Sequence, residues 1–329
     1  MSMLLAGDLG GTKALFSLID ERGQRIEQKR YESALFGSFD ALLVHFLKDL
    51  GLVGQRFASA CFAVSGPVQH GQARITNLPW QIDAAELSSQ FAIGALRLVN
   101  DFAALAHCIP TLVDDELLCL QAAPMQATEP KLVIGAGTGL GQAMLLADGD
   151  SWRVLATEAG HMGFAPNDPL QDRLLSWLRE RFDHVSVERV LSGSGLVTLY
   201  DFLREYLLFQ EDPACRLAMI EGDPAAAIAR FARQADSLLA RKTMDLFVSL
   251  FGAQAGNAAL SCLPRGGVYL AGGIAAKNAD AFIGSHFIDA FSAKGPMREL
   301  MQQFPVNLVL VQDCGLRGAE RLAVKALYT

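Results

Sequence analysis

The chain has 329 residues, of which 51% are hydrophobic and 19% are charged. This composition excludes a disordered chain and a disulfide-rich miniprotein, and the length leaves room for about two domains with separate cores. The 28 Lys and Arg residues against 35 Asp and Glu give a net charge of −7. An acidic chain is unsuited to non-specific binding of nucleic-acid phosphates, so we expect no nucleic-acid partner.

Cysteine usage and hydropathy indicate a cytoplasmic protein with no membrane partner. The six cysteines form no C-x-x-C pair, which favours ordinary buried thiols in a reducing compartment. The N-terminus lacks the basic region of a signal peptide. The uncharged stretch between Asp245 and Arg265 is long enough to span a membrane. However, it contains polar residues, which favour a buried helix of a soluble protein. They are Ser249, Gln254, Asn257 and Ser261.

The first hundred residues predict strands joined by tight turns, with one helix. Apolar runs at 3–6 and 14–19 flank a glycine-rich bend at 7–12, which is typical of a hairpin. Ser38 starts a helical pattern and Gly51 ends it, as a C′ glycine does. Buried strands are predicted at 57–64 and 95–99.

The middle of the chain repeats the N-terminal pattern. A strand at 131–134 runs into a glycine-rich segment at 135–141, and an apolar run resumes at 142–146. A repeated strand–bend–strand unit suggests two related α/β domains. The remaining expected elements are helices at 169–183, 186–208, 224–262 and 316–327 and strands at 267–271 and 306–311. The last of these helices is expected to pack on the first domain.

The segment 135–141, Gly-Ala-Gly-Thr-Gly-Leu-Gly, is suited to binding an anion. Glycines at alternate positions allow positive φ and bring backbone N–H groups close to a phosphate. The spacing does not fit the dinucleotide fingerprint G-x-G-x-x-G, and the sequence has no Gly-Lys dipeptide of a Walker A loop. The alternative is a tight hairpin without a ligand.

The N-terminal bend adds a carboxylate, Asp8, to the same kind of loop. A carboxylate among glycines loses solvation unless a cation or several donors balance it, and Mg²⁺ on a nucleotide would do so. Two facing loops, with Thr12 and Thr138, could grip a triphosphate. The pair Gly272-Gly273 follows a buried strand and would let an adenosine lie against bare backbone.

Asn100 and Asp101 end the predicted strand at 95–99, at the edge where parallel sheets bind ligands. Phosphoryl transfer to an alcohol needs a carboxylate that accepts the hydroxyl proton, and Asp101 is the candidate base. The alternative is that Asp101 caps a helix that begins at Phe102.

Three further polar residues are suited to a sugar. Glu158 and His161 are joined by a turn of small residues, and each can hydrogen-bond two adjacent hydroxyls. Glu188 lies near the start of a predicted helix, where a carboxylate also favours the helix dipole. Taken singly, each could be an ordinary surface residue.

The chain resembles the bacterial glucokinase family, within the larger hexokinase and actin-like group, in motifs that span nearly its whole length. They are GDLGGT at 7–12, NLPW at 77–80, NDFAA at 100–104, GAGTGLG at 135–141, EAGH at 158–161, ERVLSGSGL at 188–196 and LAGGI at 270–274. Their conjunction is far more specific than any one of them.

The resemblance implies an ATP-dependent kinase that phosphorylates the 6-hydroxyl of glucose, with Mg²⁺ as cofactor and a homodimeric state. Asp101 would be the catalytic base, and Asp8 would hold the metal. The sugar hydroxyls would bind to Asn100, Glu158, His161 and Glu188. The ATP would bind to Gly7, Asp8, Leu9, Gly10, Gly11, Thr12, Gly135, Gly137, Thr138, Gly139, Gly272 and Gly273.

The fold implied by the resemblance is α/β, with two actin-like (ribonuclease H-like) lobes, each a mixed β-sheet flanked by helices, and an active-site cleft between them. The small domain would comprise residues 1–111, completed by the C-terminal helix 315–329. The large domain would comprise residues 112–314.

Two departures from related patterns bear on this expectation: the first excludes a zinc site, and the second loosens the assignment of Glu158 and His161. A neighbouring family of repressors and sugar kinases carries a zinc-binding cysteine cluster after its Gly-His motif, whereas no cysteine follows His161 until Cys215, so no zinc is expected. In the glucokinase pattern a glycine is common at the position of Ala159.

The alternatives that stay open are a kinase for another hexose or an N-acetylated amino sugar, and a non-catalytic sugar or nucleotide sensor. A dehydrogenase is disfavoured by the failed fingerprint.

Overall fold

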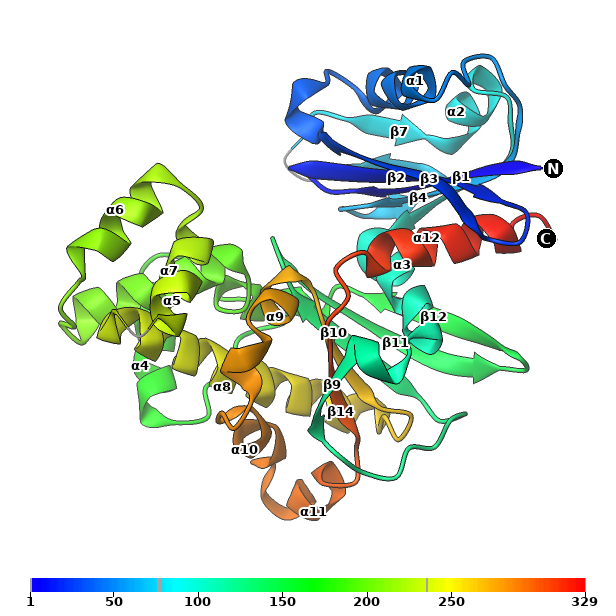
Figure 1. Cartoon of the computed structure of the whole chain (residues 1–329). Helices are drawn as coiled ribbons and strands as arrows, with labels where there is room; N and C mark the ends of the chain where they lie inside the picture. The colour runs from blue at the N-terminus through cyan, green and yellow to red at the C-terminus, as the bar shows by residue number, and fades with distance from the viewer. Residues whose placement is uncertain (1, 76–77, 235, 329) are drawn as a thin grey trace. The chain divides into compact units, whose positions relative to one another are not determined.

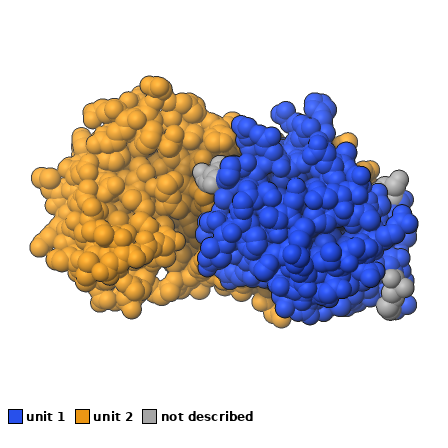
Figure 2. Space-filling view, turned by 90° about the horizontal axis from the view of Figure 1, so that it is seen from above, with its two compact units in different colours: residues 1–112, 154–156, 313–329 blue, residues 113–153, 157–312 orange. Residues whose placement is uncertain are grey.

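The computed structural model describes residues 2–75, 78–234 and 236–328. They form two compact units, coloured separately in Figure 2: unit 1 comprises 1–112, 154–156 and 313–329, and unit 2 comprises 113–153 and 157–312. The motif at 77–80 begins with Asn77, which lies outside the described residues.

Unit 1 is built on a five-stranded sheet of order β3-β2-β1-β4-β8. The expected N-terminal hairpin is confirmed, because β1 pairs antiparallel with β2. On its other side β1 runs parallel to β4, and β4 runs parallel to β8. The strands are β1 (Met3–Leu9), β2 (Lys13–Asp20), β3 (Arg25–Glu32), β4 (Phe57–Val64) and β8 (Ile93–Asn100), with a small sheet of β5 (Val68–Gln69), β6 (Gln72–Arg74) and β7 (Gln81–Asp83).

Helices cover both faces of the unit 1 sheet (Figure 1). One face packs against α1 (Phe39–Asp49) and α2 (Ala84–Gln90), and the other against α3 (Asp101–Cys108) and α12 (Cys314–Lys325). The expected caps of α1 are confirmed, since Ser38 Oγ accepts from Ala41 N at 3.2 Å and Gly51 has a φ of +68°. The last helix packs on unit 1, as expected.

Unit 2 is built on a six-stranded sheet of order β12-β11-β10-β13-β14-β9. Its central hairpin, β10 with β11, is followed on the other side by the parallel strands β13 and β14. This repeats the arrangement of β1, β2 and β4, as the internal repeat in the sequence predicts. The strands are β9 (Leu117–Gln121), β10 (Lys131–Ala136), β11 (Leu140–Asp148), β12 (Ser151–Thr157), β13 (Val268–Ala271) and β14 (Val306–Val309).

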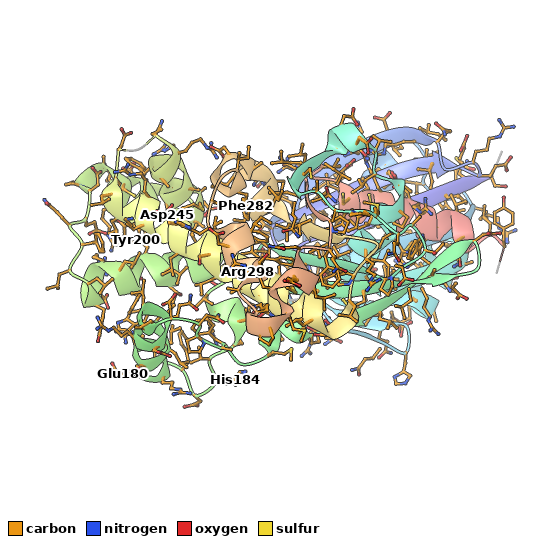
Figure 3. The ribbon with its side chains drawn as sticks, turned by 90° about the horizontal axis from the view of Figure 1, so that it is seen from below. Glu180, His184, Tyr200, Asp245, Phe282 and Arg298 are labelled. Carbon is orange, nitrogen blue, oxygen red and sulfur yellow. The ribbon has the colours of Figure 1, made fainter. Side chains whose placement is uncertain are left out.

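The helices of unit 2 share one large apolar core with the buried strands β10, β13 and β14. They are α4 (Pro169–Arg179), α5 (Gly193–Tyr206), α6 (Pro213–Glu221), α7 (Pro224–Arg233), α8 (Leu238–Cys262), α9 (Gly273–Lys277), α10 (Phe287–Ser292) and α11 (Arg298–Met301). Figure 3 shows the side chains, among them Tyr200 of α5 and Phe282, both within this core.

Two expected helices are each divided in the structure, and the helix expected at 169–183 ends at Arg179. The segment 224–262 is not one helix, because α7 ends at Arg233 and α8 starts after Ser237, whose Oγ accepts from Ala240 N at 3.2 Å. Likewise 186–208 divides into a short 3₁₀ turn (Val187–Arg189) and α5, which Ser192 caps. In both places a serine caps a new helix inside a continuous apolar pattern, so the period alone hides the break.

The uncharged stretch after Asp245 lies in the largely buried helix α8 up to Cys262, as expected. None of the helices in the part of the chain described combines the length and apolar character that a membrane span requires. The six cysteines are free thiols. The expectation that all are buried is wrong for Cys119, which is exposed, and for Cys262, which is half-buried.

Candidate functional site

Asp8 lies in the last part of β1, just before the bend to β2, and the expected bend at 7–12 is confined to 10–12. Gly10 N donates to Lys13 O at 2.9 Å and closes the bend. A side chain at Gly7 would lie 2.8 Å from the Phe62 ring, and one at Gly315 would collide with the Asp8 carboxylate. Glycine at position 7 therefore makes room for the Phe62 ring, and glycine at position 315 lets α12 approach Asp8 closely.

Asp8 carries an unusual charge environment. Burial raises the pKa of its carboxyl to about 7, and the nearby carboxylates Asp101 and Asp313 act in the same direction. A bound cation would offset both the cost of burying the charged carboxylate and its repulsion by the other two. Among the residues described, no three ligating side chains are grouped closely enough to hold a metal by themselves. Such a site fits Mg²⁺, which usually keeps water and phosphate oxygens among its ligands.

Asn100 and Asp101 lie at the same edge of the sheet as Asp8. The strand register places Asp8 beside Ala63 and Ala63 beside Val99. The helix α3 begins at Asp101 and not at Phe102, and its cap is Asn100, so the alternative assignment of Asp101 as the cap is wrong, although Asp101 Oδ1 also accepts from Phe102 N at 2.7 Å. Asn100 Oδ1 accepts from Phe102 N at 2.9 Å. This cap positions Asp101 as the first residue of a helix at the carboxyl edge of the sheet.

In unit 2 the glycine-rich segment forms the turn of the β10–β11 hairpin. Gly137 N donates to Gly139 O at 2.8 Å, and Gly137 O accepts from Gly193 N at 2.8 Å. Leu140 N donates to Glu188 Oε2 at 2.9 Å. The hairpin is therefore held by the segment that contains Glu188. Contrary to expectation, Glu188 is in the 3₁₀ turn before α5 and not at the start of that helix.

The Glu158–His161 turn packs against the same hairpin. It is a 3₁₀ turn in which a side chain at Gly160 would collide with Leu140 O. His184, labelled in Figure 3, hydrogen-bonds His161 O through Nε2 at 2.8 Å. The Glu158 and His161 side chains are exposed. The fold thus brings the Glu158–His161 turn to the same end of the hairpin as Glu188, which is distant from it in sequence.

Gly272 and Gly273 lie beside the hairpin strand β10. Gly272 has a φ of +90°, and a side chain there would lie 2.5 Å from Ala136 O. Only glycine fits this conformation and this approach. The expected adenosine segment therefore follows directly from the end of β13, next to the strand that leads into the glycine turn.

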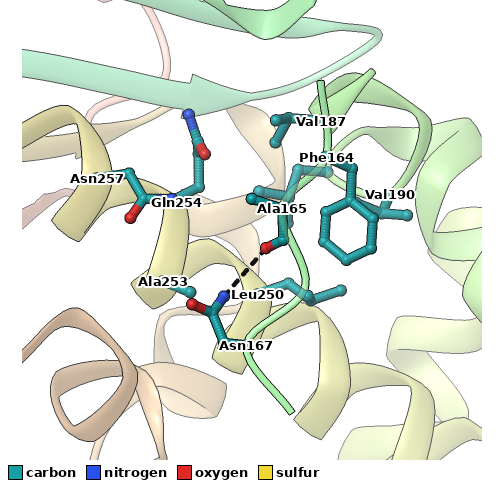
Figure 4. A pocket seen from close by; sticks show the side chains of 10 residues that line it. Phe164, Ala165, Asn167, Val187, Val190, Leu250, Ala253, Gln254 and Asn257 are labelled. Atoms are coloured by element: carbon teal, nitrogen blue, oxygen red, sulfur yellow. Dashed lines mark hydrogen bonds between the residues drawn. The ribbon is translucent and has the colours of Figure 1, made fainter. Parts of the chain in front are cut away.

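Two cavities of unit 2 lie away from these residues. A cavity of about 10 Å³, shown in Figure 4, has room for about one water molecule. It is lined by residues that include Phe164, Val187, Asn167 and Gln254. A hollow of about 430 Å³ lies along α7 and α8, beside Arg233 and Arg241. Neither contains a predicted site residue.

Some residues of these environments carry no signal in the sequence. Asp313 adds negative charge near Asp8, and Gly315 leaves room for the Asp8 carboxylate. Neither residue belongs to a motif, and only the packing of α12 against the unit 1 sheet brings them close to Asp8. The Leu140 amide is not predicted either, because a backbone donor leaves no mark in a residue pattern.

Two α/β units, each with a glycine-rich hairpin beside parallel strands, define the actin-like ATPase fold. The structure matches a ROK family glucokinase from Streptomyces griseus, solved in complex with glucose and AMPPNP, with a TM-score of 0.71 and 19% identity over 98% of this chain and 100% of that one. A glucokinase from an Antarctic psychrotroph matches with a TM-score of 0.82 and 31% identity over 99% of both chains.

The sequence narrows this class to one family. Residues 5–326 match the family described as Glucokinase. The glucokinase of Nostoc sp. is 39% identical over 99% of this chain and 100% of its own length. The chain belongs to the glucokinase family.

Proposed function

We propose that the protein transfers the γ-phosphoryl group of ATP to the 6-hydroxyl of glucose, giving glucose 6-phosphate and ADP. The full-length match to glucokinases carries this proposal. It is supported by the position of Asp101, which begins a helix at the carboxyl edge of a sheet, where a reacting group is commonly presented.

Residues of unit 1 supply the base and the metal contact. Asp101 accepts the proton of the 6-hydroxyl as its oxygen attacks the γ-phosphorus. Asn100 holds a neighbouring hydroxyl through its side-chain amide, which also donates to Gly66 O at 3.2 Å. Asp8 would hold Mg²⁺, which neutralises phosphate charge when bound. The glycines of the β1–β2 bend offer backbone N–H groups to the phosphates.

Residues of unit 2 supply the remaining sugar and nucleotide contacts. Glu158 and His161 hydrogen-bond sugar hydroxyls through side chains that are already exposed. Glu188 contributes its carboxylate, and Thr138 and the glycines of the β10–β11 turn bind phosphate. Gly272 and Gly273 lie against the adenosine, where a side chain would obstruct it.

A panel of sugars tests the substrate. The purified protein is incubated with Mg-ATP and glucose, mannose, fructose or N-acetylglucosamine, and ADP release is followed with a coupled assay. We expect glucose to give the highest kcat/KM and glucose 6-phosphate as product. A different preferred sugar would support the alternative of another hexose kinase, and sugar-independent ATP consumption would support a nucleotide-binding sensor.

We further propose a cytoplasmic homodimer that engages neither nucleic acid nor membrane. The free thiols and the negative net charge support this proposal, and the homodimer follows from the family resemblance. Light scattering on the purified protein is expected to give twice the chain mass of 35.4 kDa. A mass equal to one chain over a range of concentrations would rule the dimer out.

A further inference from the structure

The Glu188 carboxylate is engaged by the glycine-rich hairpin itself. Its Oε2 accepts a hydrogen bond from Leu140 N at 2.9 Å. A side chain at Gly139 would lie 2.5 Å from the same oxygen. The carboxylate therefore fills the space beside the hairpin that a side chain at position 139 would occupy. A hydrogen bond to a charged acceptor is among the stronger ones in proteins.

The segment that carries Glu188 is itself firmly held. Ser192, which is fully buried, donates through Oγ to Glu188 O at 2.8 Å and accepts from Gly195 N at 2.9 Å. The next residue, Gly193, donates to Gly137 O at 2.8 Å. The segment 188–193 thus contacts the hairpin at Gly137 and at Leu140, on both sides of the turn that is proposed to bind phosphate.

Glu158 offers a contrast within the same site. Its turn also packs on Leu140, through Gly160. Its side chain, however, is exposed, and no hydrogen bond found in the described part of the chain joins it to the hairpin. Of the two carboxylates proposed to bind sugar in unit 2, Glu188 is the one bonded to the hairpin.

We infer that Glu188 is a positioning residue for the nucleotide: it fixes the 137–140 turn in the conformation that binds phosphate, in addition to its proposed contact with the sugar. This inference rests on the proposed function. Because Oε2 is used by Leu140, Oε1 is the oxygen available to a sugar hydroxyl. One carboxylate then serves both ligands, so sugar binding and nucleotide binding are coupled, and the coupling is reciprocal.

The test is nucleotide binding without sugar. The affinity for Mg-AMPPNP is measured by calorimetry for the wild type and for the variants Glu188→Ala, Glu188→Gln and Glu158→Ala. Glu188→Ala is expected to weaken binding about tenfold, as the loss of one charge-assisted hydrogen bond to a positioned loop would. Glu188→Gln is expected to stay within about threefold, because its amide oxygen can still accept from Leu140 N.

Glu158→Ala is the matched control. It removes a carboxylate from the same site but no bond to the hairpin, so the sugar-free affinity for Mg-AMPPNP is expected to equal that of the wild type. Wild-type affinity in Glu188→Ala would overturn the inference, and so would an equal loss in Glu158→Ala. Thermal unfolding checks that each variant folds. If Glu188→Ala does not, Glu188→Asp replaces it, since its shorter side chain withdraws the carboxylate from Leu140.

A failure of the proposed function would look different. The titration contains no sugar, so its outcome does not depend on which sugar is the substrate. A wild type that binds Mg-AMPPNP but phosphorylates no hexose would contradict the proposed function and leave the role of Glu188 in the hairpin measurable. A wild type that binds no nucleotide would overturn both.

Discussion

Asp101 is positioned mainly by the preceding residue, Asn100, whose side chain caps the helix that Asp101 begins. Asn100 caps α3 through Oδ1, which accepts from Phe102 N at 2.9 Å and from Ala103 N at 3.2 Å. A change at Asp101 therefore leaves the principal cap in place. This separation makes Asp101 a residue at which the chemistry can be altered with little effect on the fold.

The variant Asp101→Asn tests the proposed base. An amide of the same shape cannot accept the proton of the 6-hydroxyl, so we expect kcat to fall by about 10²–10⁴-fold. Glucose affinity, measured by calorimetry, is expected to remain close to that of the wild type. Asp115→Asn, which changes an exposed carboxylate outside the proposed site, serves as the control and should keep full turnover. Near-normal turnover in Asp101→Asn would remove Asp101 as the base.

The raised pKa of Asp8 gives a pH-dependent stability. Its pKa is about 7 in the folded protein against an ordinary value of 3.8. Between these values the folded state binds more protons than the unfolded state, so this group's contribution to stability falls as pH rises from about 4 to 7. Asp8→Asn removes the penalty. Without ligands, its Tm should exceed that of the wild type by at least about 2 °C at pH 8.

The pH series supplies its own control for Asp8. Near pH 4 the wild-type carboxyl is largely protonated in the folded state, so the difference in Tm between Asp8→Asn and the wild type should become small. A variant that is less stable than the wild type at pH 8 would contradict the assignment of a charge penalty at Asp8, caused first by burial and then by repulsion from Asp101 and Asp313.

At the scale of elements, unit 1 depends on a close crossing of α3 and α12. A side chain at Gly318 of α12 would collide with Ala104 O of α3. The two helices join a shared cluster with β1 and β4, in which Leu316 and Ala319 are buried. A glycine inside a helix usually costs about 1 kcal/mol relative to alanine. Here the absence of a side chain permits the backbones to approach.

Gly318→Ala is therefore expected to destabilise unit 1, although alanine favours a helix. Overpacking of this kind lowers the free energy of unfolding by about 1–3 kcal/mol, measurable by urea denaturation. Arg321→Ala changes an exposed residue of the same helix and should alter the free energy by less than about 0.5 kcal/mol. A more stable Gly318→Ala variant would show that the helices separate without cost.

The elements that the sequence predicts well are those with local signals. The two hairpins, the strand at 57–64 and the helix between Ser38 and Gly51 all have glycine, serine or apolar patterns within a few residues. The division of 224–262 is not predicted, because the apolar period continues across Ser237. The helix α6 is not predicted as a separate element either, since its pattern is interrupted by the turns around it.

At the scale of the whole molecule, ligand binding should be visible as stabilisation. A ligand at 100 times its Kd adds about 2.7 kcal/mol to the free energy of unfolding, which for a chain of this size raises Tm by roughly 5 °C. Glucose and Mg-AMPPNP are each expected to do so in thermal melts. NAD at the same concentrations should leave Tm unchanged. Stabilisation by NAD but not by Mg-AMPPNP would contradict the proposed kinase and support a dehydrogenase.

Similarity along the full length of the chain explains why its sequence predicts the class of protein. The motifs extend from Gly7 to Ile274 in a fixed order, and the family match covers residues 5–326. Each motif alone has a local alternative. The order of all the motifs along one chain has no such local explanation, because unrelated turns and caps would not occur in the same order.

The sequence alone establishes the features that depend on short stretches of residues. They are a bend that needs glycine, a strand that ends in Asn100-Asp101, and a serine that caps a helix. These depend on interactions within a few residues, so the chain order alone predicts them. The bond from Leu140 N to Glu188, 48 residues away, and the effect of Asp313 on Asp8 could not be predicted in this way. These two interactions exist because the tertiary structure packs segments together that are distant in sequence. Burial there removes water, so that one carboxylate can accept a hydrogen bond from a backbone amide and another can repel a nearby charge.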